Sequence, residues 1–152
     1  METINHECYV SLEVAKLLKE AGFNWEVNHY YLTQNGKTEV KSDFRHPAQN
    51  YNEPMATMDS KSFEFEVCSR PSLDVAQRWF REEKNIAIDI NSNKQGFYVF
   101  IARRINMEDY TLPSVLCISA CNFNTYEEAL ENGLVVLLNN EKEETYGTKE
   151  NS

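Results

Sequence analysis

Hydrophobic residues recur every three to four positions in three separate segments of this chain, which is the spacing of an amphipathic helix. The predicted helices cover residues 11–21, 72–84 and 125–138. Each begins with a residue that caps helices well: Ser11, Ser72 or Thr125. Gly22 follows the first helix, where a glycine commonly ends one.

Other segments alternate apolar and polar residues, which is the period of a strand. Asn35-Gly36 is a strong signal for a hairpin turn, because both residues tolerate a positive φ. In residues 97–104 the side chains expected on both faces of the strand are largely apolar, which predicts a central strand. The predicted strands cover residues 25–31, 38–44, 63–68, 86–90, 97–104 and 115–121.

The two patterns together predict the α+β class. We expect the last four strands to form one small antiparallel sheet that carries helices 72–84 and 125–138 on one face, with Trp79 anchoring the core. An N-terminal helix and the hairpin extend this core. We expect one domain over residues 1–140, a long surface loop at 46–62 and a frayed polar tail at 141–152.

The chain has 152 residues and a net charge of -9, from 15 basic and 24 acidic side chains. This balance argues against nucleic-acid binding, which relies on Lys and Arg to neutralise phosphates. The sequence has no apolar run of membrane-spanning length and no signal-peptide pattern at its start. With only four cysteines and no dense disulfide framework, we expect a soluble cytoplasmic protein.

Three motifs occur together in this chain: Val-Ser-Leu-Glu-Val-Ala-Lys-Leu-Leu-Lys-Glu-Ala-Gly-Phe at 10–23, Pro-Ser-Leu-Asp-Val-Ala-Gln-Arg-Trp-Phe-Arg-Glu at 71–82 and Phe-Asn-Thr-Tyr-Glu-Glu-Ala-Leu-Glu-Asn-Gly-Leu at 123–134. In this order they resemble a family of small uncharacterised proteins from phages and mobile elements of Bacteroides-type gut bacteria. The resemblance implies a cytoplasmic accessory protein of bacterial or phage origin. It implies no activity and no functional residues.

The succession of helix, strands and helix is also similar to that of double-stranded-RNA-binding domains. Those domains hold phosphates with basic residues at the start of the last helix. Here that position reads Thr-Tyr-Glu-Glu and is acidic. The likeness therefore does not extend to RNA binding.

Four arginines are candidates for binding an anion or an acidic partner. Arg78 and Arg81 lie on the predicted helix 72–84, and Arg103 and Arg104 end the predicted strand 97–104. The alternative is that they form surface ion pairs with neighbouring carboxylates such as Glu82, Glu83 and Asp89, which is the commoner arrangement.

A second candidate surface is aromatic, since tyrosines in loops and weak strands are typical of protein interfaces: Tyr30, Tyr31, Tyr51 and Tyr110. The leading hypothesis is therefore a non-catalytic binding or accessory protein that has a protein partner or forms a homo-oligomer.

The competing hypotheses are a small enzyme with a Cys/His centre and a binder of a small anionic ligand at the arginines. His29 and His46 are the histidines considered for such a centre, but neither lies in a recognisable catalytic motif. Cys117 and Cys121 are too far apart on a strand for easy chelation, and no second ligand pair completes a zinc site. We expect no metal and no cofactor.

Overall fold

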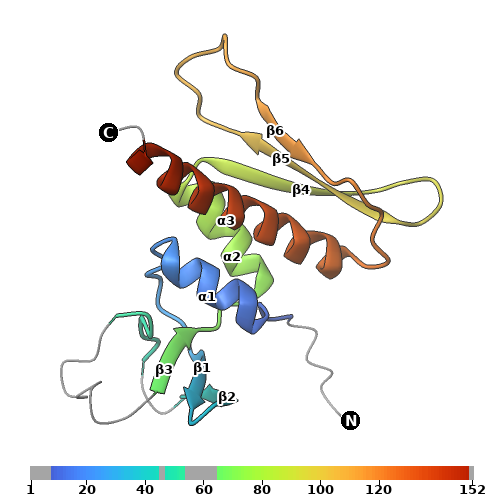
Figure 1. The fold of residues 1–152 in the computed structure, drawn as a ribbon. Coiled ribbons are helices and arrows are strands. Elements are labelled where there is room, and N and C mark those ends of the chain that lie inside the picture. The colour runs from blue at the N-terminus through green and yellow to red at the C-terminus, as the bar shows by residue number, and fades with distance from the viewer. Residues whose placement is uncertain (1–7, 45–46, 54–64, 151–152) are drawn as a thin grey trace. The chain divides into compact units, whose positions relative to one another are not determined.

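The computed structural model describes residues 8–44, 47–53 and 65–150 (Figure 1). The described elements are three helices and two small antiparallel sheets, so the predicted α+β class is confirmed. The chain divides into two compact units. The amino-terminal unit is Tyr9–Pro71, and the carboxy-terminal unit is Ser72–Ser152 together with Cys8. A single domain over residues 1–140 stays a prediction.

The amino-terminal unit contains one helix and one sheet. The helix is α1 (Leu12–Glu20), and the strands β1 (His29–Gln34), β2 (Lys37–Ser42) and β3 (Phe65–Ser69) pair in the order β2–β1–β3. The hydroxyl of Ser11 accepts the N–H of Val14 at 3.3 Å and caps α1. Helix α1 ends as predicted: Gly22 has φ +95°, and the N–H of Phe23 returns to the carbonyl of Leu18 at 2.9 Å.

The predicted hairpin turn is confirmed. Asn35 and Gly36 have φ of +51° and +78°, and Gln34 lies opposite Lys37 in the β1–β2 register. Two central residues with positive φ match the right-handed twist of the flanking strands. The turn chemistry of these two residues therefore sets the register of the hairpin.

The described part of the predicted surface loop is held by polar contacts. The backbone N–H of Val27 donates to the carbonyl of Gln49 at 2.8 Å, and the return bond measures 3.0 Å. The amide of Asn52 donates to the carbonyl of Phe23 and accepts the N–H of Ser69, both at 2.9 Å. Residues 47–53 are thus attached to the sheet unit, while 46 and 54–62 lie outside the described residues.

The carboxy-terminal unit is a sheet with two helices. Strands β4 (Ile86–Ser92), β5 (Tyr98–Arg104) and β6 (Val115–Ile118) pair antiparallel in that order. Helices α2 (Leu73–Glu83) and α3 (Tyr126–Glu150) pack on one face of this sheet, as predicted (Figure 1). The hydroxyls of Ser72 and Thr125 accept the N–H groups of Val75 and Glu128 at 3.2 and 3.1 Å, so both predicted caps are confirmed.

The core of this unit lies between the helices and the sheet. Trp79 and Phe80 are buried on α2, with their rings edge to face at a centroid distance of 5.2 Å. Gly133 allows α3 to approach the sheet closely. A Cβ atom at this position would lie 3.2 Å from both Ile88 Cγ2 and Phe100 Cγ, which is closer than ordinary packing allows.

Three sequence-based expectations about these elements differ from the structure. The segment predicted as strand 63–68 was assigned to the sheet with 86–90, but β3 pairs with β1 and belongs to the other sheet. The last helix was expected to end at 138, but α3 continues to Glu150 and includes most of the expected polar tail. The first strand is also displaced, because β1 begins at His29 and not at residue 25.

Among the described residues, no helix combines the length and the apolar character needed to cross a lipid bilayer.

Candidate functional site

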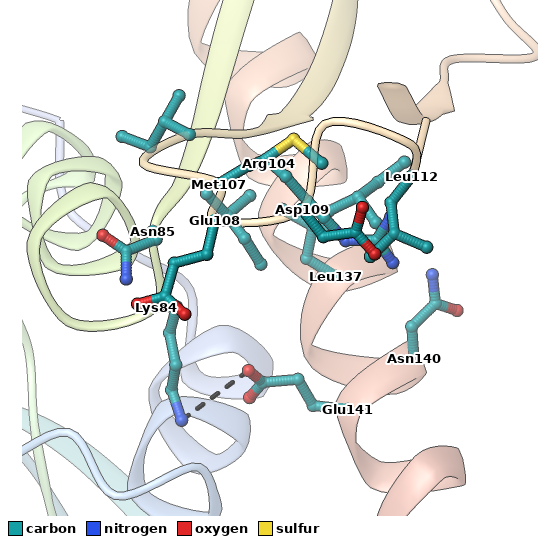
Figure 2. A pocket seen from close by; sticks show the side chains of 13 residues that line it. Lys84, Asn85, Arg104, Met107, Glu108, Asp109, Leu112, Leu137, Asn140 and Glu141 are labelled. Carbon is teal, nitrogen blue, oxygen red and sulfur yellow. Dashed lines mark ion pairs between the residues drawn. The ribbon is translucent and has the colours of Figure 1, made fainter. Parts of the chain in front are cut away.

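A pocket of about 550 Å³ opens in the carboxy-terminal unit where the C-terminal end of α2, helix α3 and the loop between β5 and β6 meet (Figure 2). We call it the α2–α3 pocket. A volume of this size is within the usual range for small-molecule sites. Its walls carry six apolar side chains: Ile86, Ile105, Met107, Leu112, Leu116 and Leu137.

Two asparagines in a left-handed conformation fix the loop side of this pocket. Asn85 ends α2 with φ +54°, and Asn106 has φ +55°. The side-chain amide of Asn106 donates to Asn85 Oδ1 at 3.1 Å, and the N–H of Ile105 donates to the carbonyl of Asn85 at 2.9 Å. Asparagine adopts this backbone conformation more readily than other non-glycine residues. The start of the β5–β6 loop is therefore attached to the end of α2.

Charged side chains surround the apolar walls. Lys84 pairs with Glu141 across the two helices at 3.6 Å, and in Figure 2 this pair lies at one end of the pocket while Asp109 lies at the other. Arg104 donates to the carbonyl of Pro113 at 3.0 Å. Hydrogen bonds from the hydroxyl and the N–H of Thr111 lower the pKa of Asp109, which keeps that carboxyl ionised at neutral pH.

The second candidate surface is the face of the β4–β5–β6 sheet that points away from α2 and α3. Ile88 and Phe100 point toward α3, because both side chains lie beside Gly133. Side chains alternate along a strand, so Asp89, Ile101 and Arg103 lie on the opposite face. We call this opposite face the outer sheet face.

Exposed apolar residues of β6 belong to the outer sheet face. Val115 lies opposite Arg103 and Ile118 lies opposite Ile101 in the β5–β6 register. Val115 is 44% exposed and Ile118 is 61% exposed. A β-bulge between Ala102 and Arg103 shifts the register, which puts both residues on this face.

The two edges of this sheet differ. On the β4 edge, the side-chain amide of Gln77 from α2 donates to the carbonyl of Ile88 at 2.7 Å and occupies a group that another strand could use. Strand β6 forms the other edge and reads Val-Leu-Cys-Ile, with no charged residue and no proline. Charges and prolines are common devices that keep an edge strand from pairing with another chain.

The structure does not bring the four predicted arginines together. Arg78 pairs with Glu82 at 3.0 Å one turn along α2, and Nε of Arg103 donates to Asp89 at 2.7 Å on the outer sheet face. Arg104 follows Arg103 in the strand, points to the opposite face and lines the α2–α3 pocket. Arg81 is exposed near the end of α2. Surface ion pairing therefore accounts for two of the four, and a binding role for any of them stays a prediction.

The four predicted tyrosines lie in different environments. Tyr110 is 91% exposed, in the β5–β6 loop. Tyr51 is only 6% exposed and stacks on Tyr30 at a centroid distance of 4.4 Å, so the expectation that Tyr51 is a surface residue is wrong. Tyr31 is half-buried, and its hydroxyl donates to the carbonyl of Val10 at 2.6 Å. Packing occupies three of these rings, and their role in an interface stays a prediction.

The groups considered for a Cys/His centre have structural contacts. Burial raises the pKa of the Cys68 thiol to about 11 and also raises the pKa of Cys117, which disfavours the thiolate that a nucleophile needs. His29 lies 3.1 Å from the hydroxyl of Tyr9 and 2.7 Å from that of Ser42. His46 lies outside the described residues. Among the residues that the structure describes, no three His, Cys, Asp or Glu side chains gather as metal ligands.

No protein-family model, curated protein or solved structure matches this chain. The resemblance to small phage and mobile-element proteins therefore stays an expectation.

Sequence reasoning did not find the α2–α3 pocket or the contact of Gln77 with β4. Ile105, Met107 and Leu112 are apolar residues of one loop, and such residues are a signal that a loop covers something. The other apolar residues that line the pocket come from β4, β6 and α3. Spacing along the chain does not predict such distant neighbours.

Proposed function

We propose that this protein is a non-catalytic binding protein and that its partner at the outer sheet face is a second copy of the same chain, paired through β6. The observation that carries this proposal is the exposed, uncharged edge strand Val115–Ile118. An edge strand presents unpaired N–H and C=O groups, which favours pairing with another strand. Exposed apolar side chains beside that edge add a hydrophobic contribution to the same contact.

A second copy satisfies the requirements of this surface. In a two-fold interface the same patch meets itself, so the patch must be self-complementary. Because all four residues of β6 are apolar, every antiparallel pairing of two β6 strands sets apolar residues opposite apolar residues. Arg103 and Asp89 form an ion pair beside β6, so these two side chains together add no net charge there. The net charge of -9 therefore comes from other residues.

The expected dimer is weak. Strand β6 has only four residues, and the bulge at Ala102 and Arg103 limits the length of a regular ladder. Few additional hydrogen bonds and a small apolar contact correspond to a dissociation constant of about 10 µM. Such a dimer forms and dissociates with protein concentration.

Other parts of the functional hypothesis rest on the sequence. The four free cysteines and the acidic composition support a cytoplasmic location as part of this proposal. An accessory role in bacteria, phages or mobile elements rests on the three motifs at 10–23, 71–82 and 123–134. The Cys/His enzyme is not favoured, because burial raises the pKa of two of the thiols.

The test is the molar mass in solution, measured by light scattering after gel filtration from about 1 to about 100 µM, a range around the expected dissociation constant. We expect the wild-type mass to rise toward that of a dimer, and Ile118→Lys to keep the mass of a monomer. Val136→Lys is the matched control, because Val136 is an apolar residue of α3 that is 36% exposed. This control should dimerise like the wild type.

Circular dichroism during thermal unfolding accompanies each sample, and Val115→Lys serves as a second test of the edge if Ile118→Lys unfolds. A wild-type mass that stays monomeric at every concentration would overturn the proposal. Dimerisation that survives both edge substitutions, or that is lost in the control as well, would place the contact somewhere other than β6.

A further inference from the structure

We propose that the α2–α3 pocket binds a small organic cation with an apolar body, such as an alkylammonium. This inference goes beyond self-association and rests on different observations. It follows from the apolar walls of the pocket, from the contacts that already occupy its cations, and from the carboxylates that remain.

The apolar body of the ligand would contact the pocket walls. Leu137 comes from α3, Leu116 from β6 and Ile86 from β4, so three separate elements contribute to one apolar surface. Sites that bind small organic molecules usually combine such apolar walls with a few polar groups. Burying a chain of several CH₂ groups against these walls is favourable, because it removes apolar surface from water.

Both cations at the pocket already have partners. Lys84 is paired with Glu141, and its ammonium group also lies 5.4 Å from the centre of the Trp79 ring. The guanidinium group of Arg104 donates to the backbone carbonyl of Pro113. An incoming anion would have to compete with these contacts and would meet three nearby carboxylates.

Two carboxylates remain without a cation. Glu108 and Asp109 are consecutive residues of the β5–β6 loop, and in Figure 2 their carboxylates point toward opposite ends of the pocket that both residues line. Within the described residues neither forms an ion pair. The bonds from Thr111 keep Asp109 ionised. Three carboxylates therefore face two cations around the pocket, namely Glu108, Asp109 and Glu141 against Lys84 and Arg104. This imbalance attracts a positive ligand group and repels a negative one.

The loop geometry places these charges beside the apolar walls. The contacts of Asn106 and Ile105 with Asn85 attach one end of the loop to α2. The bond from Arg104 to Pro113 and the bond from the N–H of Arg104 to Ser114 at 2.7 Å hold the other end. A ligand can therefore contact the walls with its chain while its ammonium group lies near one of these carboxylates, Glu108 at the Lys84 end or Asp109 at the other.

The experiment titrates the full chain with hexylammonium and with hexanoate, two probes of equal chain length and opposite charge. Chemical-shift changes in two-dimensional ¹⁵N–¹H NMR spectra report both affinity and place. We expect hexylammonium to bind at least about tenfold more tightly than hexanoate, because the carboxylates attract the first probe and repel the second. The largest shifts should fall on residues that line the pocket.

The variant Glu108→Gln with Asp109→Asn removes both free carboxylates without changing side-chain size. We expect it to weaken hexylammonium binding about tenfold and to leave hexanoate binding unchanged or slightly stronger. The matched control is Glu127→Gln with Glu128→Gln, which removes two adjacent exposed carboxylates that do not line the pocket. This control should bind hexylammonium like the wild type.

Three results would overturn the inference. The first is the absence of pocket shifts with hexylammonium at millimolar concentration. The second is hexanoate binding that equals or exceeds hexylammonium binding. The third is an equal loss of affinity in the control, which would assign the attraction to the overall charge of -9 and not to Glu108 and Asp109.

Discussion

The four cysteines differ in exposure, and this difference determines how fast each thiol reacts. Cys8 and Cys121 are exposed, Cys117 is half-buried and Cys68 is buried in β3. Burial raises the pKa of Cys68 to about 11, with the Lys19 ammonium opposing the shift and the Glu66 carboxylate adding to it. At pH 8 only about one Cys68 side chain in a thousand is then a thiolate.

We predict that iodoacetamide at pH 8 alkylates Cys8 and Cys121 in the native protein while Cys68 stays unmodified, as measured by peptide mass spectrometry. The raised pKa favours the protonated thiol, so the reactivity of Cys68 should increase with pH up to about 11. In guanidinium chloride at pH 8 all four thiols should react alike, because an unfolded thiol has a pKa of about 8.5. Native labelling of Cys68 at the rate of Cys121 would contradict its burial.

The sequence-based predictions were most reliable for single residues. Ser72, Gly22 and the Asn35-Gly36 turn act through backbone groups within a few residues, so their effect is readable from the chain alone. Tyr51 was misplaced because its burial depends on Tyr30, a residue far away in the sequence.

At the scale of elements, the central helix depends on one aromatic side chain. Trp79 is 2% exposed, lies edge to face with Phe80 and has Lys84 near its ring. We predict that Trp79→Ala lowers the free energy of unfolding by about 3–5 kcal/mol, the range for emptying a buried aromatic site. Urea unfolding followed by circular dichroism measures this change.

Arg81→Ala on the same helix is the control for this substitution. Arg81 is exposed, and surface substitutions of this kind usually change stability by less than about 0.5 kcal/mol. If Trp79→Ala unfolded at the same urea concentration as this control, the side chain would not anchor the core.

The partners of the strands could not be predicted from the pattern. Alternation shows which side chains share a face, but it does not identify the neighbouring strand. Strand β3 precedes α2 directly, and consecutive elements are often neighbours, which favours the prediction that it shares a sheet with the strands that follow α2. Its pairing with β1 instead accompanies the contacts of Ser69 with Tyr51 and Asn52, which come from a segment without a regular period.

At the scale of the whole molecule, the charge of -9 governs which partners can approach. The arginines offer no shared face for a phosphate backbone, since Arg103 and Arg104 point to opposite sides of their sheet. We predict no binding of labelled single- or double-stranded DNA in fluorescence anisotropy at low salt. The variant with Arg78, Arg81, Arg103 and Arg104 changed to alanine should behave identically. Micromolar binding that disappears in this variant would refute the prediction.

The hydrogen bond of Gln77 with Ile88 has a consequence for the size of any assembly. A sheet with two open ends can add copies without limit and grow into a fibre. Here Gln77 already occupies one carbonyl of the β4 edge, so a further strand has fewer hydrogen-bonding groups available there than at β6. In a sheet joined through β6, the two β4 strands form the borders. Gln77 would thus act against further growth, and this mode of pairing favours a pair over a longer array.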